Sequence, residues 1–398
     1  MNTIALSFRY LWAKPLAAAL NLLLLSLGLA SMAFLLLIGD QLDKAFERDL
    51  AGIDVVVGAK GSPLQLILAG VFHLDVPSGN VPLKAVDALR EHPQVARVIP
   101  ISLGDSFRGF RIVGTSPDYP AHYQATLTIG AWWSAPMQAV LGAHVAAQTG
   151  LRTGDKFEGS HGLGNTGQVH GNTPYQVSGV MAPTGGVLDR LILTATESVW
   201  QVHESATAID DADKKIMQDE RELTLALIQY KTPLAAVTFP RFINSSTEMQ
   251  AAAPAIEITR LLRMLGLGID VMRALAAILL VTAALSVFIA LWNAVRERRA
   301  DLALLRMLGA PPLKLAALLL CEALWLALLA TLLGVLLGQG LVAWLGWMLQ
   351  LDQSMLLGGW VWPVSLWGVP LLAVLVAAAA ALVPAYGAYR VSVFELLK

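Results

Sequence analysis

The chain has 398 residues, of which 56% are hydrophobic and only 14% are charged. This composition excludes an ordinary soluble protein and indicates that much of the chain lies in lipid. The formal net charge of −1 provides no basic surface for nucleic acid, and the single cysteine, Cys321, excludes intrachain disulfides and Cys-rich zinc sites.

Four apolar stretches contain no Lys or Arg and are long enough to cross a bilayer as helices. We predict transmembrane helices over residues 16–38, 274–292, 315–345 and 364–386. The first exceeds the hydrophobic region of a signal peptide and is not followed by a small-residue cleavage site, so we interpret it as an uncleaved anchor.

Nine of the 28 Lys and Arg residues lie in three short segments outside these spans: 1–15, 293–314 and 387–398. The other 19 lie in the long stretch 39–273, to which the charge rule does not apply. The loop 346–363 contains no Lys or Arg, and its only charged residue is Asp352. The positive-inside rule therefore predicts that both termini and the loop 293–314 are cytoplasmic, with residues 39–273 on the outer side.

Residues 39–273 resemble a soluble α+β domain. Short β-branched runs such as 95–101 and 107–113 alternate with turns, and we predict helices over 82–90 and 139–149. The pattern favours small mixed subdomains over one continuous sheet. At the two ends of this stretch, residues 39–50 and 254–270 have apolar residues at helical spacing, and each segment adjoins a membrane span. This pattern predicts that both spans continue outward as a helical stalk. The alternative is two ordinary helices that cap the domain.

An apolar run over residues 63–74 is too short to span lipid. It indicates either a buried element, which we favour, or a contact for a periplasmic partner. The contact would use the apolar side chains Leu64, Leu66, Ile67, Leu68 and Phe72. The histidines between 161 and 170 lie in a Gly-rich segment, which we interpret as a loop and not as a metal site.

The loop after the second span reads Val295-Arg-Glu-Arg-Arg-Ala-Asp-Leu-Ala-Leu-Leu-Arg-Met-Leu-Gly-Ala-Pro-Pro312. It resembles the signature of the FtsX-like permeases, the family of FtsX, LolC, LolE and the membrane part of MacB. Residues 384–390 and 394–397 resemble the same family's tail, and the order of one span, an outer domain and three spans also matches.

The resemblance implies that this loop is a coupling helix that docks on a cytoplasmic ABC ATPase. The residues expected at the contact are Arg296, Arg298, Arg299, Leu302, Leu305, Arg306, Met307 and Gly309. It also implies a second permease copy, identical or paralogous. A membrane-surface loop without a partner is the alternative.

The chain lacks the phosphate-binding pattern Gly-x-x-x-x-Gly-Lys-Ser/Thr. We therefore expect no catalytic, cofactor-binding or metal-binding residues here, and we expect ATP and Mg²⁺ on a separate ATPase subunit. Within the spans, Glu322 indicates an intramembrane polar site, which could tie its helix to the coupling loop through Arg296 or Arg306. Gly334 and Gly338 have the spacing of close helix packing.

Taken with the resemblance, these features predict the permease subunit of an ABC transporter in a bacterial inner membrane. It would transmit ATP-driven movement to its periplasmic domain for export or extraction of a substrate at the outer face. One alternative is a non-transporting regulator of a periplasmic cell-wall hydrolase, and a second is part of a metal or small-ligand uptake system. The outer partner would be an adaptor, a carrier or a hydrolase.

Overall fold

The computed structural model describes residues 3–162, 173–207, 215–218, 220–351 and 358–390. The chain divides into two compact units. Unit 1 contains residues 1–43, 265–349 and 357–398, and unit 2 contains residues 44–264 and 350–356. Asp352, His170 and the tail motif at 394–397 lie outside the described residues.

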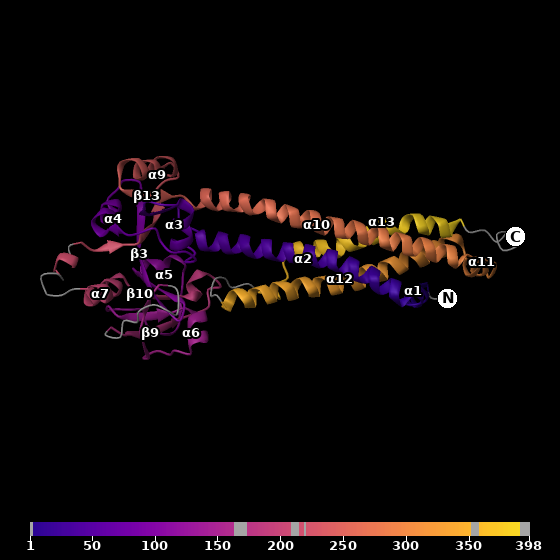
Figure 1. Cartoon of the computed structure of the whole chain (residues 1–398), viewed down its shortest axis with the longest axis horizontal. Coiled ribbons are helices and arrows are strands. Elements are labelled where there is room, and N and C mark those ends of the chain that lie inside the picture. Colours follow the sequence, from indigo (N-terminus) through magenta and orange to yellow (C-terminus); the bar gives the residue numbers. More distant parts are fainter. Residues whose placement is uncertain (1–2, 163–172, 208–214, 219, 352–357, 391–398) are drawn as a thin grey trace. The chain divides into compact units, whose positions relative to one another are not determined.

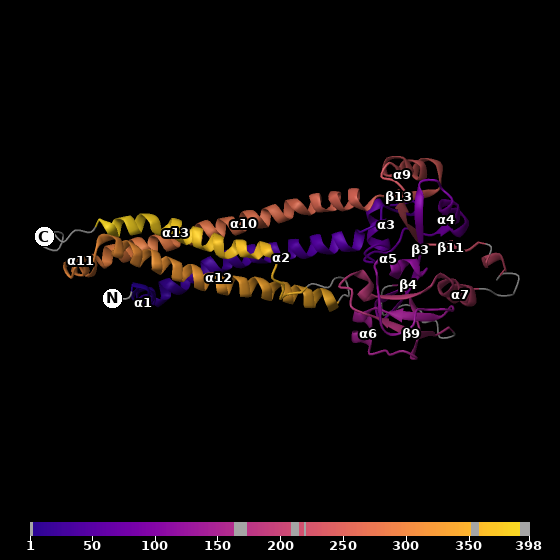
Figure 2. The same cartoon turned by 180° about the vertical axis from the view of Figure 1, so that it is seen from behind.

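Unit 1 consists of helices (Figures 1 and 2). They are α1 (Thr3–Leu11), most of α2 (Pro15–Leu50), most of α10 (Pro254–Glu297), α11 (Arg299–Met307), α12 (Pro312–Leu351), a 3₁₀ turn (Val364–Trp367) and α13 (Gly368–Tyr389). Among the described residues, four helices, α2, α10, α12 and α13, are long and apolar enough to cross a membrane, which confirms the predicted membrane architecture.

Exposed aromatic side chains gather at both ends of the membrane helices. At the end near the α12 to α13 connection they are Trp344, Trp347, Trp360, Trp362 and Trp367, and at the end near α11 they are Trp12, Trp292, Tyr386 and Tyr389. Trp and Tyr prefer the two membrane interfaces because their rings are apolar and their N–H or O–H groups are polar. The two groups therefore mark where unit 1 meets the two surfaces of a bilayer.

Small residues let the membrane helices pack closely. The buried side chains at the centre of unit 1 are mainly Leu and Ala, because lipid supplies no hydrophobic driving force and close backbone approach must stabilise the bundle. Ser286 of α10 donates a hydrogen bond of 2.6 Å to the Asn21 side chain of α2. The sequence reasoning left the N-terminal segment unassigned, and the structure forms it into α1, whose Phe8 ring lies 5.1 Å from that of Trp325 on α12.

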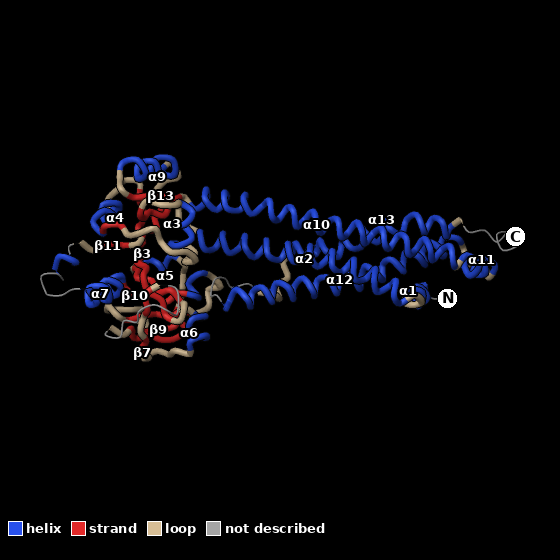
Figure 3. Tube along the Cα trace, viewed as in Figure 1, coloured by secondary structure: helices blue, strands red, loops and turns tan. Residues whose placement is uncertain are grey.

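Unit 2 combines helices and strands (Figure 3). Its helices are α3 (Pro63–Gly70), α4 (Leu83–Arg90), α5 (Asp118–His122), α6 (Ala143–Thr149), α7 (Thr196–Thr207) and α9 (Ala235–Ser246). Its strands are β1 (Val55–Ala59), β2 (Val81–Pro82), β3 (Val95–Phe107), β4 (Phe110–Thr115), β5 (Leu127–Gly130), β6 (Gln138–Leu141), β7 (Lys156–Phe157), β8 (Ser160–His161), β9 (Tyr175–Met181), β10 (Leu191–Ala195), β11 (Glu222–Leu223), β12 (Leu225–Tyr230) and β13 (Met249–Ala252). The predicted α+β class is confirmed.

The prediction of small separate subdomains is wrong. Within the described residues one sheet runs in the order β13-β1-β12-β3-β4-β10-β6-β9-β5, and β2 pairs with β11 in a second, two-stranded sheet. Strand β3 makes the large sheet continuous because Ile101 pairs with Leu225 of β12 on one side and with Thr115 of β4 on the other. The pair β4 and β10 and the pair β6 and β9 are parallel, and the remaining pairs are antiparallel.

The prediction of one helix over 139–149 is also wrong, because Gln138–Leu141 forms strand β6 and the helix begins only at Ala143. The apolar run at 139–141 fits a buried strand as well as a buried helix turn, and pairing with β9 and β10 favours the strand. The end of the helix is as expected, since Gly150 has φ of 73° and closes it.

Both helices that leave unit 1 end against the core of unit 2. Phe46 and Leu50 of α2 and Leu261 of α10 pack on the apolar cluster built around β1, β12 and α3. The Phe46 ring contacts that of Phe72 at 5.4 Å between centroids. Residues 44–50 and 254–264 thus belong to the packed outer unit as well as to the helices that continue into unit 1.

Candidate functional site

The coupling loop is a short helix held between two breaks. Helix α10 ends at Glu297, Arg298 leaves helical geometry, and α11 runs from Arg299 to Met307. Gly309 has φ of 91°, which lets its N–H bond the Arg306 carbonyl and the Ala310 N–H bond the Leu305 carbonyl, both at 3.0 Å. A glycine in this conformation ends a helix at little cost, which explains the Arg-x-x-Gly spacing.

The apolar residues of α11 face two ways. Leu302 is buried and Leu305 is half-buried against the helix bundle, whereas Leu304, Met307 and Leu308 are 49%, 54% and 84% exposed. The expectation that Leu302 contacts a partner is therefore corrected: it anchors α11 to unit 1. Leu308 was missed, although its position one residue after Met307 and before Gly309 extends the same apolar group.

The basic residues of the loop also divide. Arg296 and Arg299 are exposed. Arg298 lies over the Tyr10 ring at 4.5 Å from its centroid and donates to the Tyr10 carbonyl at 3.2 Å. Glu297 forms an ion pair with Lys14. These contacts tie the loop to the α1 to α2 connection, so Arg298 has a role inside unit 1 and Arg296 and Arg299 face outward.

A pocket of about 310 Å³ lies beside α11. It is lined by Thr3, Leu6, Leu305, Leu308, Gly309, Ala310, Lys314, Leu315 and Leu318, which come from α1, α11, the α11 to α12 connection and the start of α12. Helix α1 is therefore one wall of the candidate docking surface, which the sequence reasoning did not foresee. We define the coupling surface as α11, Leu308 and this pocket.

Glu322 is 6% exposed and lines a second pocket, of about 140 Å³. Arg298 lines the same pocket, so it is Arg298, and not the predicted Arg296 or Arg306, that shares a cavity with Glu322.

Gly334 and Gly338 lie against α2 of the same chain. A Cβ atom at Gly334 would stand 2.8 Å from the Leu29 Cβ, and one at Gly338 would stand 2.8 Å from the Ala33 Cβ. Gly340 has no neighbouring atom within 4 Å of such a Cβ. The close approach predicted from the Gly-x-x-x-Gly spacing is therefore an intrachain contact between the first and third spans.

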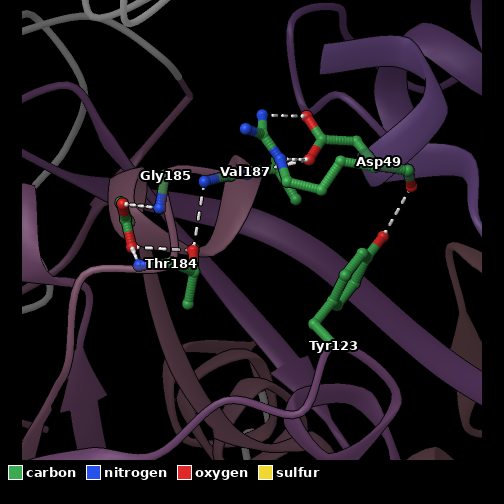
Figure 4. Close-up of polar contacts among 8 residues, drawn as sticks. Asp49, Tyr123, Thr184, Gly185 and Val187 are labelled. Carbon is green, nitrogen blue, oxygen red and sulfur yellow. Dashed lines mark hydrogen bonds and ion pairs between the residues drawn. The ribbon is translucent and has the colours of Figure 1, made fainter. Parts of the chain in front are cut away.

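In unit 2, the end of α2 is held by a buried carboxylate (Figure 4). Asp49, 5% exposed, pairs with Arg48 at 2.9 Å and accepts a hydrogen bond of 3.4 Å from the Val187 N–H. The Tyr123 hydroxyl donates to the Asp49 carbonyl at 2.9 Å. The last turn of α2 is therefore joined by polar contacts to two loops of unit 2.

The loop that contacts Asp49 is itself fixed by Asp189. Its carboxylate accepts hydrogen bonds from the Thr184 N–H and hydroxyl, both at 2.8 Å, and from the Gly185 N–H at 2.7 Å (Figure 4). Buried carboxylates bonded to several N–H groups stabilise one loop conformation. The position where α2 meets unit 2 is thus preorganised.

The apolar run at 63–74 forms α3 and the residues after it. Leu66, Ile67 and Phe72 are at most 5% exposed and belong to the core of unit 2, so these three side chains do not form a contact surface; Leu64 and Leu68 are half-buried.

Two buried titratable side chains of unit 2 are His73, which comes shortly after α3, and Arg111. His73 bonds the Tyr119 hydroxyl at 2.9 Å, and burial, with Arg111 nearby, holds the pKa of His73 well below its usual value. Burial lowers the pKa of Arg111 to about 10, while its guanidinium donates to the Asp75 carbonyl at 2.8 Å. These groups fix the core and its loops. Across the described part of the chain, no group of three or more His, Cys, Asp or Glu could hold a metal ion.

Four helices long enough to cross a membrane, a short helix after the second of them and an α+β unit between the first two are the architecture of a multi-pass membrane protein. Residues 18–226 match the model of the MacB-like periplasmic core domain, and residues 273–393 match that of the FtsX-like permease C-terminal region. The chain therefore belongs to the FtsX and MacB family of permeases, which form the permease component of ABC transporters.

Similar curated proteins are the pyoverdine export ATP-binding/permease proteins PvdT. The one from Pseudomonas entomophila is 28% identical over 194 residues, and the one from Pseudomonas putida is 23% identical over 192 residues. Each match covers 46% of this chain and 28% of the relative, so the chain spans little more than a quarter of their length.

Two solved structures are similar to part of this chain. The periplasmic region of MacB from Actinobacillus actinomycetemcomitans is 10% identical with a TM-score of 0.35 and covers 54% of this chain and 95% of that one. The extracellular domain of the transporter YknZ from Gram-positive bacteria is 10% identical with a TM-score of 0.31, and the match covers 50% of this chain and 98% of that one.

Proposed function

We propose that this permease exports or extracts a substrate at the outer face of the membrane, driven by an ATPase that docks on the coupling surface. The observation that carries the proposal is α11, which anchors Leu302 in unit 1 while it leaves Leu304, Met307 and Leu308 exposed beside Arg296 and Arg299. Apolar anchors with a basic rim are typical of a helix that docks in a groove of a soluble partner.

Movement of α11 would reach the outer side through α2 and α10. Each is one helix that continues past the boundary of unit 1, and each ends on the core of unit 2. The spans themselves carry few polar groups for a solute path: the Asn21 amide is already bonded to Ser286, and Glu322 is the ionisable residue. We therefore propose work at the outer face by a pair of permease copies, and not conduction through the spans.

Export is favoured over the two alternatives by the relatives, which are named for pyoverdine export. If the protein only regulated a cell-wall hydrolase, no exported compound would depend on it. Uptake would require a ligand site in unit 2, and the described residues there form no metal-binding group. The cargo would be identified by comparing the compounds that wild-type and deletion strains release into the medium.

Breaking α2 tests the transmission. An insert of four glycines between Ile38 and Leu42 should abolish export while ATP hydrolysis by the complex persists, because each glycine weakens a helix by about 1 kcal/mol and lets it bend. The measurements are export in a deletion strain and ATPase rate of the purified complex. The same insert between Gly79 and Asn80, an exposed turn of unit 2, should leave both intact. Full export with the α2 insert would contradict the proposal.

The orientation of the chain is tested by cysteine labelling. In a Cys321→Ser background, Thr153→Cys should react with a membrane-impermeant maleimide in whole cells, and Ala300→Cys should react only after lysis. Both positions are exposed in the structure, so reactivity reports the side of the membrane and not burial. The positive-inside rule predicts this pattern, and the reverse pattern would show that the outer unit is cytoplasmic.

A further inference from the structure

The 140 Å³ pocket that contains Glu322 lies inside unit 1, at the end of the helix bundle that carries α11. Its walls come from the end of α1, the α1 to α2 connection, the first turns of α2, the last turns of α10 with Arg298, and the first half of α12. They are Tyr10, Leu11, Lys14, Ala17, Ala18, Asn21, Ala290, Leu291, Asn293, Ala294, Glu297, Arg298, Glu322 and Leu326. Trp12 and Trp292, which are adjacent in sequence to the lining residues Leu11 and Leu291, are exposed, as aromatic side chains at a membrane interface are.

One acceptor in this pocket has no donor. Glu322 is 6% exposed, and within the described residues its Oε2 has no hydrogen-bond partner. Four of the other polar groups that line the pocket are engaged: Lys14 pairs with Glu297, Arg298 donates to the Tyr10 carbonyl, and Asn21 accepts from Ser286. Burying a carboxylate without a hydrogen-bond donor is unfavourable, so a ligand that supplies an N–H or O–H group would bind favourably in this pocket.

The charges around the pocket select the class of ligand. Lys14 and Arg298 are positive, Glu297 and Glu322 are negative, and their sum is zero. A ligand with a net charge would leave one charge uncompensated, whereas a zwitterion with an ammonium and a phosphate complements both signs. The volume equals that of about four to five liquid waters, which suits a small headgroup. A quaternary ammonium has no N–H for Glu322.

We propose that this pocket binds the headgroup of an aminophospholipid from the adjacent leaflet, with its ammonium donating to Glu322 and its phosphate near Lys14 and Arg298. Lys14 and Glu297 are each about half exposed, 53% and 54%, so their pair stands at the mouth and can admit a phosphate. The lipid would join the α1 to α2 connection, α10 and α12 at the root of the coupling helix.

The test is native mass spectrometry of the full chain with phosphatidylethanolamine, its N,N-dimethyl derivative and phosphatidylcholine of matched acyl chains. The wild type should retain phosphatidylethanolamine about tenfold more tightly than phosphatidylcholine, the effect of one hydrogen bond to a charged group. The dimethyl lipid still has an N–H and should rank above phosphatidylcholine. Glu322→Gln should remove most of the preference, and Glu322→Asp, which keeps the carboxylate, should retain it.

The matched control is Gln339→Leu, because Gln339 is a buried polar residue of the same helix that does not line the pocket. It should leave the lipid preference unchanged. Equal retention of the lipids by the wild type, or an unaltered preference in Glu322→Gln, would overturn the proposal. Displacement of the lipid by an equal concentration of soluble phosphoethanolamine would assign the pocket to a free zwitterion and overturn the lipid assignment.

Discussion

Replacing Leu304 and Met307 together by Asp should weaken binding of the ATPase at least about a hundredfold, since two apolar anchors at an interface are worth roughly 2 kcal/mol each or more. Both side chains are about half exposed, so the change should leave unit 1 folded. The measurement is the affinity of the purified permease for its proposed ATPase subunit.

The control for this variant is Asp301→Asn, an exposed polar position on the same helix, which should bind the ATPase nearly as the wild type does. Leu302→Asp should behave differently from both, because it places a charge among buried side chains and should lower the melting temperature of the permease itself. Wild-type affinity in the double Asp variant would remove α11 as the docking element.

Gly334→Leu and Gly338→Leu should each destabilise unit 1, because the new Cβ would lie 2.8 Å from a Cβ of α2 and the two helices would have to move apart. Overpacking of this kind costs roughly 1 to 3 kcal/mol per site, and the double variant should fail to accumulate in the membrane. The measurements are melting temperature in detergent and membrane yield.

Gly340→Leu is the matched control for the glycine contact. It lies on the same helix two residues from Gly338, and its Cβ would meet no atom within 4 Å. It should therefore keep the wild-type melting temperature. Leucine is a better helix former than glycine, so equal loss of stability at Gly340 and Gly334 would show that the contact with α2 does not determine the effect.

The membrane part of the fold is predictable because composition alone reveals it. Long apolar runs identify the four spans, and the order of elements follows directly. The sheet of unit 2 is not predictable in this way. Val55 pairs with Ile228 and Asp105 pairs with His161, and such pairings between distant segments leave no trace in the local pattern. The ambiguity of the run at 139–141 has the same origin.

The candidate site was only partly predictable. The loop signature locates α11, and Gly309 locates its end, but a nine-residue helix with Leu302, Leu304 and Leu305 does not reveal which leucine faces the bundle. That choice depends on where α1 and α12 lie. The arginine nearest to Glu322 was not predictable for a similar reason: Arg298 lines the same pocket because it contacts Tyr10, a residue almost three hundred positions earlier in the chain.

The thirteen-residue strand β3 has a consequence for how unit 2 can deform. Its first half is bonded to β12 and its second half to β4, and the register with β4 shifts between Leu103 and Ser106. Shear between the two parts of the sheet is opposed by hydrogen bonds on both edges of this strand. Bending at this irregularity breaks none of the regular pairs between β3 and β4, so the sheet can flex along a line that crosses β3 at Gly104.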